Sequence, residues 1–209
     1  MWVDSPGQMR YIMPAMRVSA DIAFKEWAVV VDALSHGEQI LILRKGGIRE
    51  KRGEFQVDHR AFWLFPTQYH EAERSVIASK RPALRELAAT APSDAVDIQF
   101  YAVADPVVGI ADASVLGRLQ GRHVWAEDVL QQRFEFGRET GLHALIVRVY
   151  QLPRPERLPL RESYGGCKSW VQLEHTVAGE VTPLVDDAEF ARQRDEIIEL
   201  VSDHACANS

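Results

Sequence analysis

The chain of 209 residues carries a formal net charge of −6, is 46% hydrophobic and 26% charged, and contains two cysteines. This composition fits one globular domain and excludes both a disulfide framework and a protein that is cationic as a whole. No apolar run reaches the roughly 20 residues that a membrane-spanning helix needs, and the N-terminal segment lacks the continuous apolar core of a signal peptide. We therefore expect a cytoplasmic protein that does not bind a membrane.

The first elements follow from apolar spacing. Residues 1–19 are expected to form a flexible lead-in. An amphipathic helix is predicted from Asp21 to Ser35, with Gly37 ending it. The short apolar run Gln39–Arg44 predicts a central strand, because a strand that is buried on both faces shows no alternation.

The rest of the chain interleaves strands and helices. Further strands are predicted at Phe62–Phe65, Ile98–Val103, Leu142–Tyr150 and Ser169–Leu173. Helices are predicted over Tyr69–Ala89 (with Pro82 opening a second helix), Asp112–Leu119, Ala126–Phe136 and Asp186–Val201. A proline-rich connector is expected over Leu152–Pro159.

This irregular order favours an α+β fold over a doubly wound parallel sheet. We expect a small mixed β-barrel decorated with helices, in a single α+β domain over residues 20–175. Residues 176–209 are expected to form a helical extension, whose amphipathic helix could pack on the domain or serve a partner.

The strongest candidate for a working surface is a basic, glycine-hinged turn between residues 44 and 52. It carries five cations in nine residues around a glycine pair: Arg44, Lys45, Arg49, Lys51 and Arg52, with Gly46 and Gly47. Cationic donors beside a pliable backbone favour phosphate binding, although the spacing is not that of a P-loop. A solvated hairpin turn fits the same residues.

An aromatic segment follows the basic turn. Trp63 and Phe65 could offer rings on which a base stacks, with His59 and His70 close to them in sequence. Packing of the same rings in the core explains the segment equally well, because alternation along a strand would bury half of them.

Candidates for catalysis are weaker. Glu26, Glu50 and His70 could serve as acid or base in a metal-dependent nuclease or a nucleotide hydrolase. No spacing predicts a metal site or a cofactor. Trp125 and Arg133 favour structural roles, as a helix staple and an ion-pair partner.

Several segments together resemble a bacterial and plant family known by a domain-of-unknown-function label. They span about Asp21 to Leu173 and are Phe24–Ile48 (FKEWAVVVDALSHGEQILILRKGGI), Phe62–His70 (FWLFPTQYH), His123–Arg133 (HVWAEDVLQQR) and Arg148–Trp170 (RVYQL through YGGCKSW). The resemblance names relatives and implies no activity.

A looser resemblance is to ASCH domains of the PUA-like superfamily, small β-barrels that are associated with RNA binding and include some hydrolases. The match rests on Gly37 and Arg44, at the spacing of the ASCH motif. Gln39 and Ile42 stand where that motif has Lys and Glu, so the resemblance implies a PUA/ASCH-like barrel and a cation at the strand end, without the catalytic pair.

The leading hypothesis is therefore a domain that binds RNA or a nucleotide. In this hypothesis Arg44, Lys45 and Arg49 hold phosphate, and Lys168 approaches from a facing turn at Gly165–Gly166. The alternatives are the hydrolytic enzyme above and a protein-interaction module whose basic turn docks an acidic partner.

Overall fold

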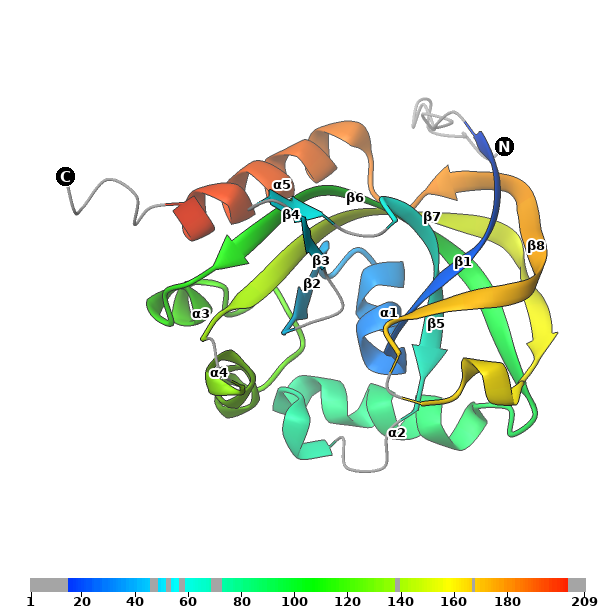
Figure 1. Ribbon diagram of the computed structural model, residues 1–209, viewed down its shortest axis with the longest axis horizontal. Helices are drawn as coiled ribbons and strands as arrows, with labels where there is room; N and C mark the ends of the chain where they lie inside the picture. Colours follow the sequence, from blue (N-terminus) through cyan, green and yellow to red (C-terminus); the bar gives the residue numbers. More distant parts are fainter. Residues whose placement is uncertain are drawn as a thin grey trace, which may run out of the picture.

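Five strands close into a ring in the computed structural model, with the order β7–β6–β5–β1–β8 and a return pairing of β8 with β7. The structure describes residues 15–45, 49–51, 54–56, 59–68, 73–137, 140–166 and 168–202. Their strands are β1 (Met16–Trp27), β2 (Leu41–Arg44), β3 (Arg49–Lys51), β4 (Glu54–Gln56), β5 (Ala61–Thr67), β6 (Ala95–Ile110), β7 (Leu142–Pro159) and β8 (Trp170–Pro183). The helices among them are α1 (Ala28–Ser35), α2 (Arg81–Thr90), α3 (Ser114–Arg118), α4 (Glu127–Glu135) and α5 (Asp187–Ser202) (Figure 1).

The ring is a mixed sheet. β1 pairs with β5 in parallel, whereas the β5–β6, β6–β7, β7–β8 and β8–β1 pairs are antiparallel. β6 carries register shifts at Ile98/Phe100 and Ala104/Val107, where bulges bend a long strand so that the sheet can curve and close. The predicted mixed β-barrel with helices is confirmed.

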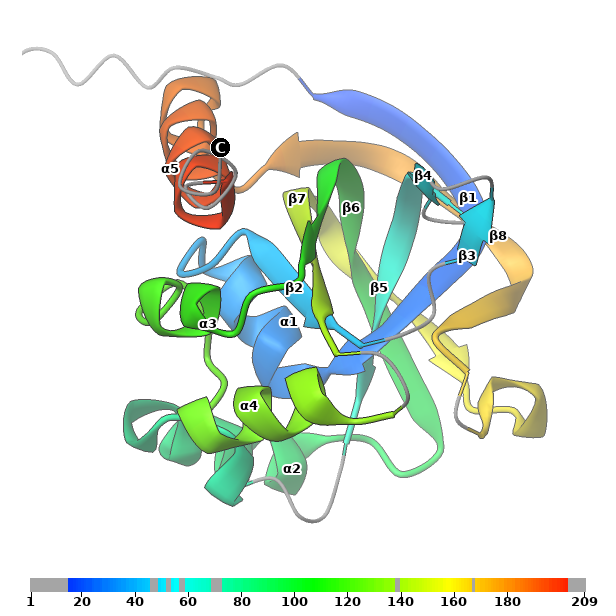
Figure 2. The same ribbon diagram turned by 60° about the vertical axis from the view of Figure 1, so that its left-hand side comes forward.

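Two hydrophobic clusters divide the interior. The smaller is built by the five ring strands and the short 3₁₀ helix at Glu162–Tyr164, and it includes Ala23 and Trp63. The larger joins the opposite face of the ring, through Phe24 and Phe62, to β2 and to helices α1, α3, α4 and α5. Figure 2 shows α1, α3 and α4 gathered on one side of the barrel, with α5 above them.

The predicted helix at Asp21–Ser35 is correct only for its second half. Residues up to Trp27 belong to β1, which pairs with β8 from Met16 and with β5 from Ala23. Ala23 and Phe24 are both fully buried, because each face of β1 lies against one of the two clusters. α1 then ends as predicted at Gly37, whose φ of 67° places it in the left-handed region that glycine tolerates.

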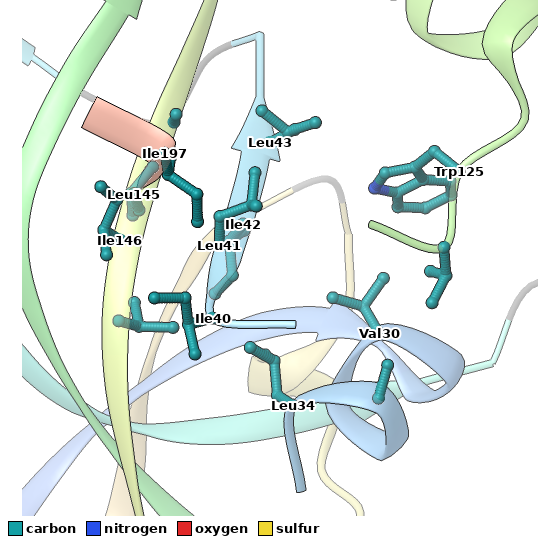
Figure 3. Packing of buried hydrophobic residues seen from close by; sticks show 14 of the residues in the cluster. Val30, Leu34, Ile40, Leu41, Ile42, Leu43, Trp125, Leu145, Ile146 and Ile197 are labelled. Atoms are coloured by element: carbon teal, nitrogen blue, oxygen red, sulfur yellow. The ribbon is translucent and has the colours of Figure 1, made fainter. Parts of the chain in front are cut away.

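The predicted strand at Gln39–Arg44 exists, but it is not central. β2 pairs with β7 alone and forms the edge of the sheet. Its side chains are nevertheless buried, because Trp125 and α1 lie on one side of it and Ile197 of α5 on the other (Figure 3).

Two further boundaries differ from the sequence prediction. The proline-rich segment Leu152–Pro159 continues β7, and its last four residues pair with β6 from Ile98 back to Ala95, so it is not a connector. β8 runs to Pro183 and completes the ring, so the barrel extends past residue 175. α5 packs on the domain through Phe190, Ile197 and Val201, which belong to the larger cluster.

Candidate functional site

The Arg44 side chain links three parts of the barrel at the end of β2. Its Nη2 donates to Ser169 Oγ at 2.8 Å, just before β8, and its Nη1 lies 3.4 Å from Glu26 Oε2, near the end of β1. The guanidinium carbon lies 4.8 Å from the centroid of the Phe24 ring. Arg44 is therefore held in place by an acid, a hydroxyl group and a ring.

Glu26 is the acid at the centre of this arrangement. Its side chain is 2% exposed, and Oε1 accepts a hydrogen bond from the backbone N–H of Trp27 at 2.7 Å. Burial raises the pKa of this carboxyl group, while the charges of Arg44 and Arg133 and the Trp27 hydrogen bond partly oppose that shift. Burial thus favours the neutral acid, and the two arginines favour the carboxylate.

Arg133 approaches the same carboxyl group from α4. Its guanidinium carbon lies 3.7 Å from the centroid of the Trp125 ring and 5.6 Å from that of Trp27. Burial lowers the pKa of Arg133, the charge of Glu26 opposes this shift, and the charge of Arg44 adds to it. We call Glu26, Arg44, Arg133 and Ser169 the Glu26 cluster.

Aromatic rings surround the Glu26 cluster. Trp170 contacts Phe24 at 4.7 Å and the His59 ring at 5.2 Å between centroids, and Trp27 contacts Trp125 at 4.8 Å. Each arginine of the cluster thus lies against a ring, which favours a cation without supplying hydrogen-bond acceptors.

The sequence-predicted site residues separate into two groups. Glu26 and Arg44 come together, and Lys168 is exposed beside Ser169. Lys45 instead donates from Nζ to the carbonyl oxygens of Phe134 and Gly141, at 2.8 and 3.0 Å, and ties the end of α4 to the start of β7.

The two rings predicted to stack on a base lie inside the protein. Trp63 is fully buried and donates from Nε1 to the carbonyl oxygen of Ala20 at 3.1 Å, and Phe65 is 3% exposed and packs on Tyr164. Strand β5 turns both side chains toward the smaller hydrophobic cluster. This burial contradicts a stacking role for either ring, because neither offers a free face.

The remaining candidates either lie outside the described residues or are described only by the strand to which they belong. Gly46, Gly47 and His70 fall outside the described residues. Arg49 and Glu50 belong to β3, which pairs with β4 in a separate two-stranded sheet. Within the described ranges no group of three or more His, Cys, Asp or Glu side chains could hold a metal ion.

Arg133 and Ser169 complete the site in ways that the sequence did not reveal. Arg133 was expected to form an ion pair, yet it stacks on two tryptophans. Ser169 was expected to begin a strand, and it lies directly before β8, where its hydroxyl group accepts a hydrogen bond from Arg44. Glu26 and Ser169 are 143 positions apart, and the β1–β8 pairing brings both within reach of Arg44, so no local pattern could have signalled their shared partner.

A pocket of about 970 Å³ lies between α1, the end of β5, α2, the start of β6 and the turn at residues 160–166. Lys25 lines it and donates from Nζ to the carbonyl oxygens of Tyr164 and Gly166, at 2.8 and 2.9 Å. Successive side chains of a strand point to opposite faces, so Lys25 and Glu26 lie on different faces of β1. The pocket is therefore separate from the Glu26 cluster.

Comparisons with known proteins give a family and a distant structural likeness. A family model described as "Domain of unknown function (DUF1802)" matches residues 23–196. No curated protein matches the chain significantly. The crystal structure of ASCH from Zymomonas mobilis is similar at 11% identity and a TM-score of 0.41, over 87% of this chain and 95% of that one. A mutant of the same ASCH protein is similar at 15% identity and a TM-score of 0.41, over 73% of this chain and 89% of that one.

In the part of the chain that the structure describes, no helix is both long and apolar enough to cross a membrane.

Proposed function

The chain belongs to the DUF1802 family, and because that family carries no assigned activity, we propose a function from the site itself: the protein binds RNA or a nucleotide at the end of β2. Arg44 contacts a phosphate group of the ligand, and the rings around the Glu26 cluster contact its bases. Lys168 adds positive charge at the rim, beside Ser169.

The observation that carries this proposal is that the Arg44 guanidinium is held in a fixed orientation and has a weak acidic partner. The Arg44 side chain is 22% exposed, and its guanidinium is held by the hydroxyl group of Ser169 and the ring of Phe24. Its only acidic partner among the described residues is Glu26, at 3.4 Å, and burial raises the pKa of that acid. An arginine oriented in this way and weakly neutralised is suited to an oxyanion.

The surrounding rings support a ligand that also carries bases. Trp27 and Trp170 are partly exposed, and the ring of His59 lies against Trp170. Single-stranded nucleic acids bind through a combination of positive charge and aromatic surface, and every base has a face that can stack. The net charge of −6 means that this attraction is local to the site.

The test measures the affinity of the full chain for fluorescently labelled single-stranded RNA, and for uridine 5′-monophosphate, over a series of salt concentrations. Arg44→Ala is expected to weaken RNA binding at least about tenfold, equivalent to about 1.4 kcal/mol. Its log–log salt slope should fall by about 0.7 for the one lost phosphate contact.

The matched control is Arg192→Ala, which removes the same charge from α5. Arg192 is paired with Glu189 and Glu196, and its side chain is 59% exposed, so its loss should leave the affinity unchanged. Absence of binding by the wild type to both RNA and the nucleotide would overturn the proposal. So would a folded Arg44→Ala variant that binds as tightly as the wild type.

Hydrolysis of the bound ligand is a second candidate, favoured by one observation. The Glu26 carboxyl group is buried beside a guanidinium, and its raised pKa suits a group that exchanges a proton. Release of product by the wild type, with none by Glu26→Gln at equal ligand occupancy, would support it. No product from RNA or nucleotides, with or without Mg²⁺ or Mn²⁺, would exclude it.

A further inference from the structure

Arg133 has a role that the proposed function does not use. Its guanidinium lies on the Trp125 ring at 3.7 Å and near the Trp27 ring at 5.6 Å, and it makes no hydrogen bond to any residue that the structure describes. A guanidinium has five N–H donors in a fixed fork, and ring contacts satisfy none of them. The edge of Arg133 is therefore prepared for an acceptor that the described protein residues do not supply.

The stacking also fixes how Arg133 presents this edge. Trp125 is buried and lies directly before α4, so its ring is held by the core. A planar cation resting on a fixed ring loses little further freedom when it binds, and this lowers the entropic cost of recognition. Arginine held in this manner suits a ligand with two or more oxygens in one plane.

Arg44 contacts the same acid. Its Nη1 is 3.4 Å from Glu26 Oε2, while Glu26 Oε1 accepts the N–H of Trp27, the residue whose ring Arg133 approaches. The charges of both guanidinium groups therefore act on one buried carboxyl group. With Glu26 ionised the three side chains carry a net charge of +1, and with Glu26 neutral they carry +2.

Resting on the proposed function, we propose that Arg133 and Arg44 together bind a terminal phosphate of the nucleotide or RNA, and that this phosphate takes over from Glu26 as their counter-ion. A terminal phosphate carries close to two negative charges and three free oxygens, so it can serve both forks at once. A phosphodiester within a chain has one charge and two free oxygens, so it matches one guanidinium better than two.

Proton uptake accompanies this exchange. The charged side chains that face the Glu26 carboxyl group are Arg44 from β2 and Arg133 from α4. A bound phosphate neutralises both and adds like charge beside the acid, so a proton moves from solvent to the Glu26 carboxylate. No bond of the ligand is broken.

The experiment compares ligands that differ only in the terminal phosphate. Uridine 5′-monophosphate is compared with uridine, and a 5′-phosphorylated hexauridylate with its 5′-hydroxyl form, by titration calorimetry. The wild type is expected to prefer each phosphorylated ligand by at least about tenfold. Titrations in two buffers of different ionisation enthalpy are expected to reveal uptake of up to one proton per ligand.

Two variants and one control test whether the preference for a terminal phosphate depends on Arg133. Arg133→Met keeps an unbranched chain on Trp125 but removes the fork, and it should lose most of the preference for the terminal phosphate. Arg133→Lys keeps the charge without the fork and should recover only part of it. Arg192→Ala, with the same loss of charge on α5, should keep the full preference.

The outcomes distinguish the inference about the terminal phosphate from the proposed function. Equal affinity of the wild type for phosphorylated and unphosphorylated ligands overturns the inference and leaves the proposed function intact. A preference that survives unchanged in a folded Arg133→Met variant also overturns it. If Arg133→Met does not fold, Arg133→Lys decides in the same way. Failure of the wild type to bind any of the four ligands overturns the proposed function itself.

Discussion

His123 is predicted to make the fold sensitive to mild acid. It is 6% exposed, in the loop between α3 and α4, and burial lowers its pKa from the ordinary 6.5 to about 4. The loop cannot swing outward easily, because Val124 N–H donates to Gln39 Oε1 at 3.1 Å and Ile77 N–H donates to the Val124 carbonyl oxygen at 2.9 Å. The buried ring therefore gains a proton less readily while the protein stays folded, so acid favours the unfolded state, in which the ring is free to be protonated.

The size of the effect follows from the two pKa values. The folded-state pKa lies below the unfolded one, so the stability contributed by the neutral ring is complete above about pH 6.5 and is lost as the pH falls toward about 4. The full difference is roughly 3 kcal/mol, at about 1.4 kcal/mol for each pH unit. Near pH 5 about 2 kcal/mol of the unfolding free energy should already be lost.

Urea denaturation near pH 7 and near pH 5 measures this loss. The wild type should lose about 2 kcal/mol more than His123→Gln, whose side chain does not titrate. His175→Gln is the control, because the His175 side chain is 54% exposed, and it should follow the wild type. Parallel losses in the wild type and His123→Gln, or a His123 ring that titrates near pH 6.5 by NMR in the folded protein, would refute the reasoning.

Two further predictions separate structure from binding. Lys45→Met removes the bonds to Phe134 and Gly141 and should lower the unfolding free energy by about 2 kcal/mol, while RNA affinity stays within about twofold; an unchanged urea midpoint would contradict this. Burial raises the folded-state pKa of Glu26, so the wild type loses stability as the pH rises above the ordinary value. The melting temperature of Glu26→Gln minus that of the wild type should therefore increase with pH, and a flat difference would contradict it.

Sequence patterns predicted the elements that have one buried face or a clear boundary. The amphipathic pattern of α5 is one example, with Phe190, Ile197 and Val201 on the core side. The helix end at Gly37 is another, because a left-handed residue is required there. In both cases local chemistry alone determines the structure.

The prediction failed where an element is buried on both faces. β1 carries apolar residues at helical spacing from Phe24 onward, and its strand conformation depends on β5 and β8, which lie far away in sequence. The same limit explains β7, whose prolines at 153, 155 and 159 indicated a connector. Pro153 and Pro155 are tolerated because they lie at a register shift, where β7 has no partner on β6, and Pro159 is the last residue of the strand.

The same limit explains why only part of the site could be predicted from the sequence. Arg44 could be found because a cation directly follows a short apolar strand. The partnership of Glu26, Arg133 and Ser169 could not, because β1, α4 and the segment before β8 meet only through the closed ring. Burial of Trp63 and Phe65 was open at the sequence level, since β5 could have turned either face outward.

The parallel pairing of β1 with β5 explains why the site lies where it does. Parallel strands end at the same edge of a sheet, so Glu26 and Thr67 meet there, and Thr67 Oγ1 donates to the Glu26 carbonyl oxygen at 3.0 Å. The chain between these strands must return across the barrel, and that return contains α1 and β2. The crossover which the parallel pair requires therefore brings Arg44 to the end of β1. The antiparallel partner β8 begins beside the same end and supplies Ser169. One parallel pair in an otherwise antiparallel ring thus helps to gather an acid, a guanidinium and a hydroxyl group at one edge.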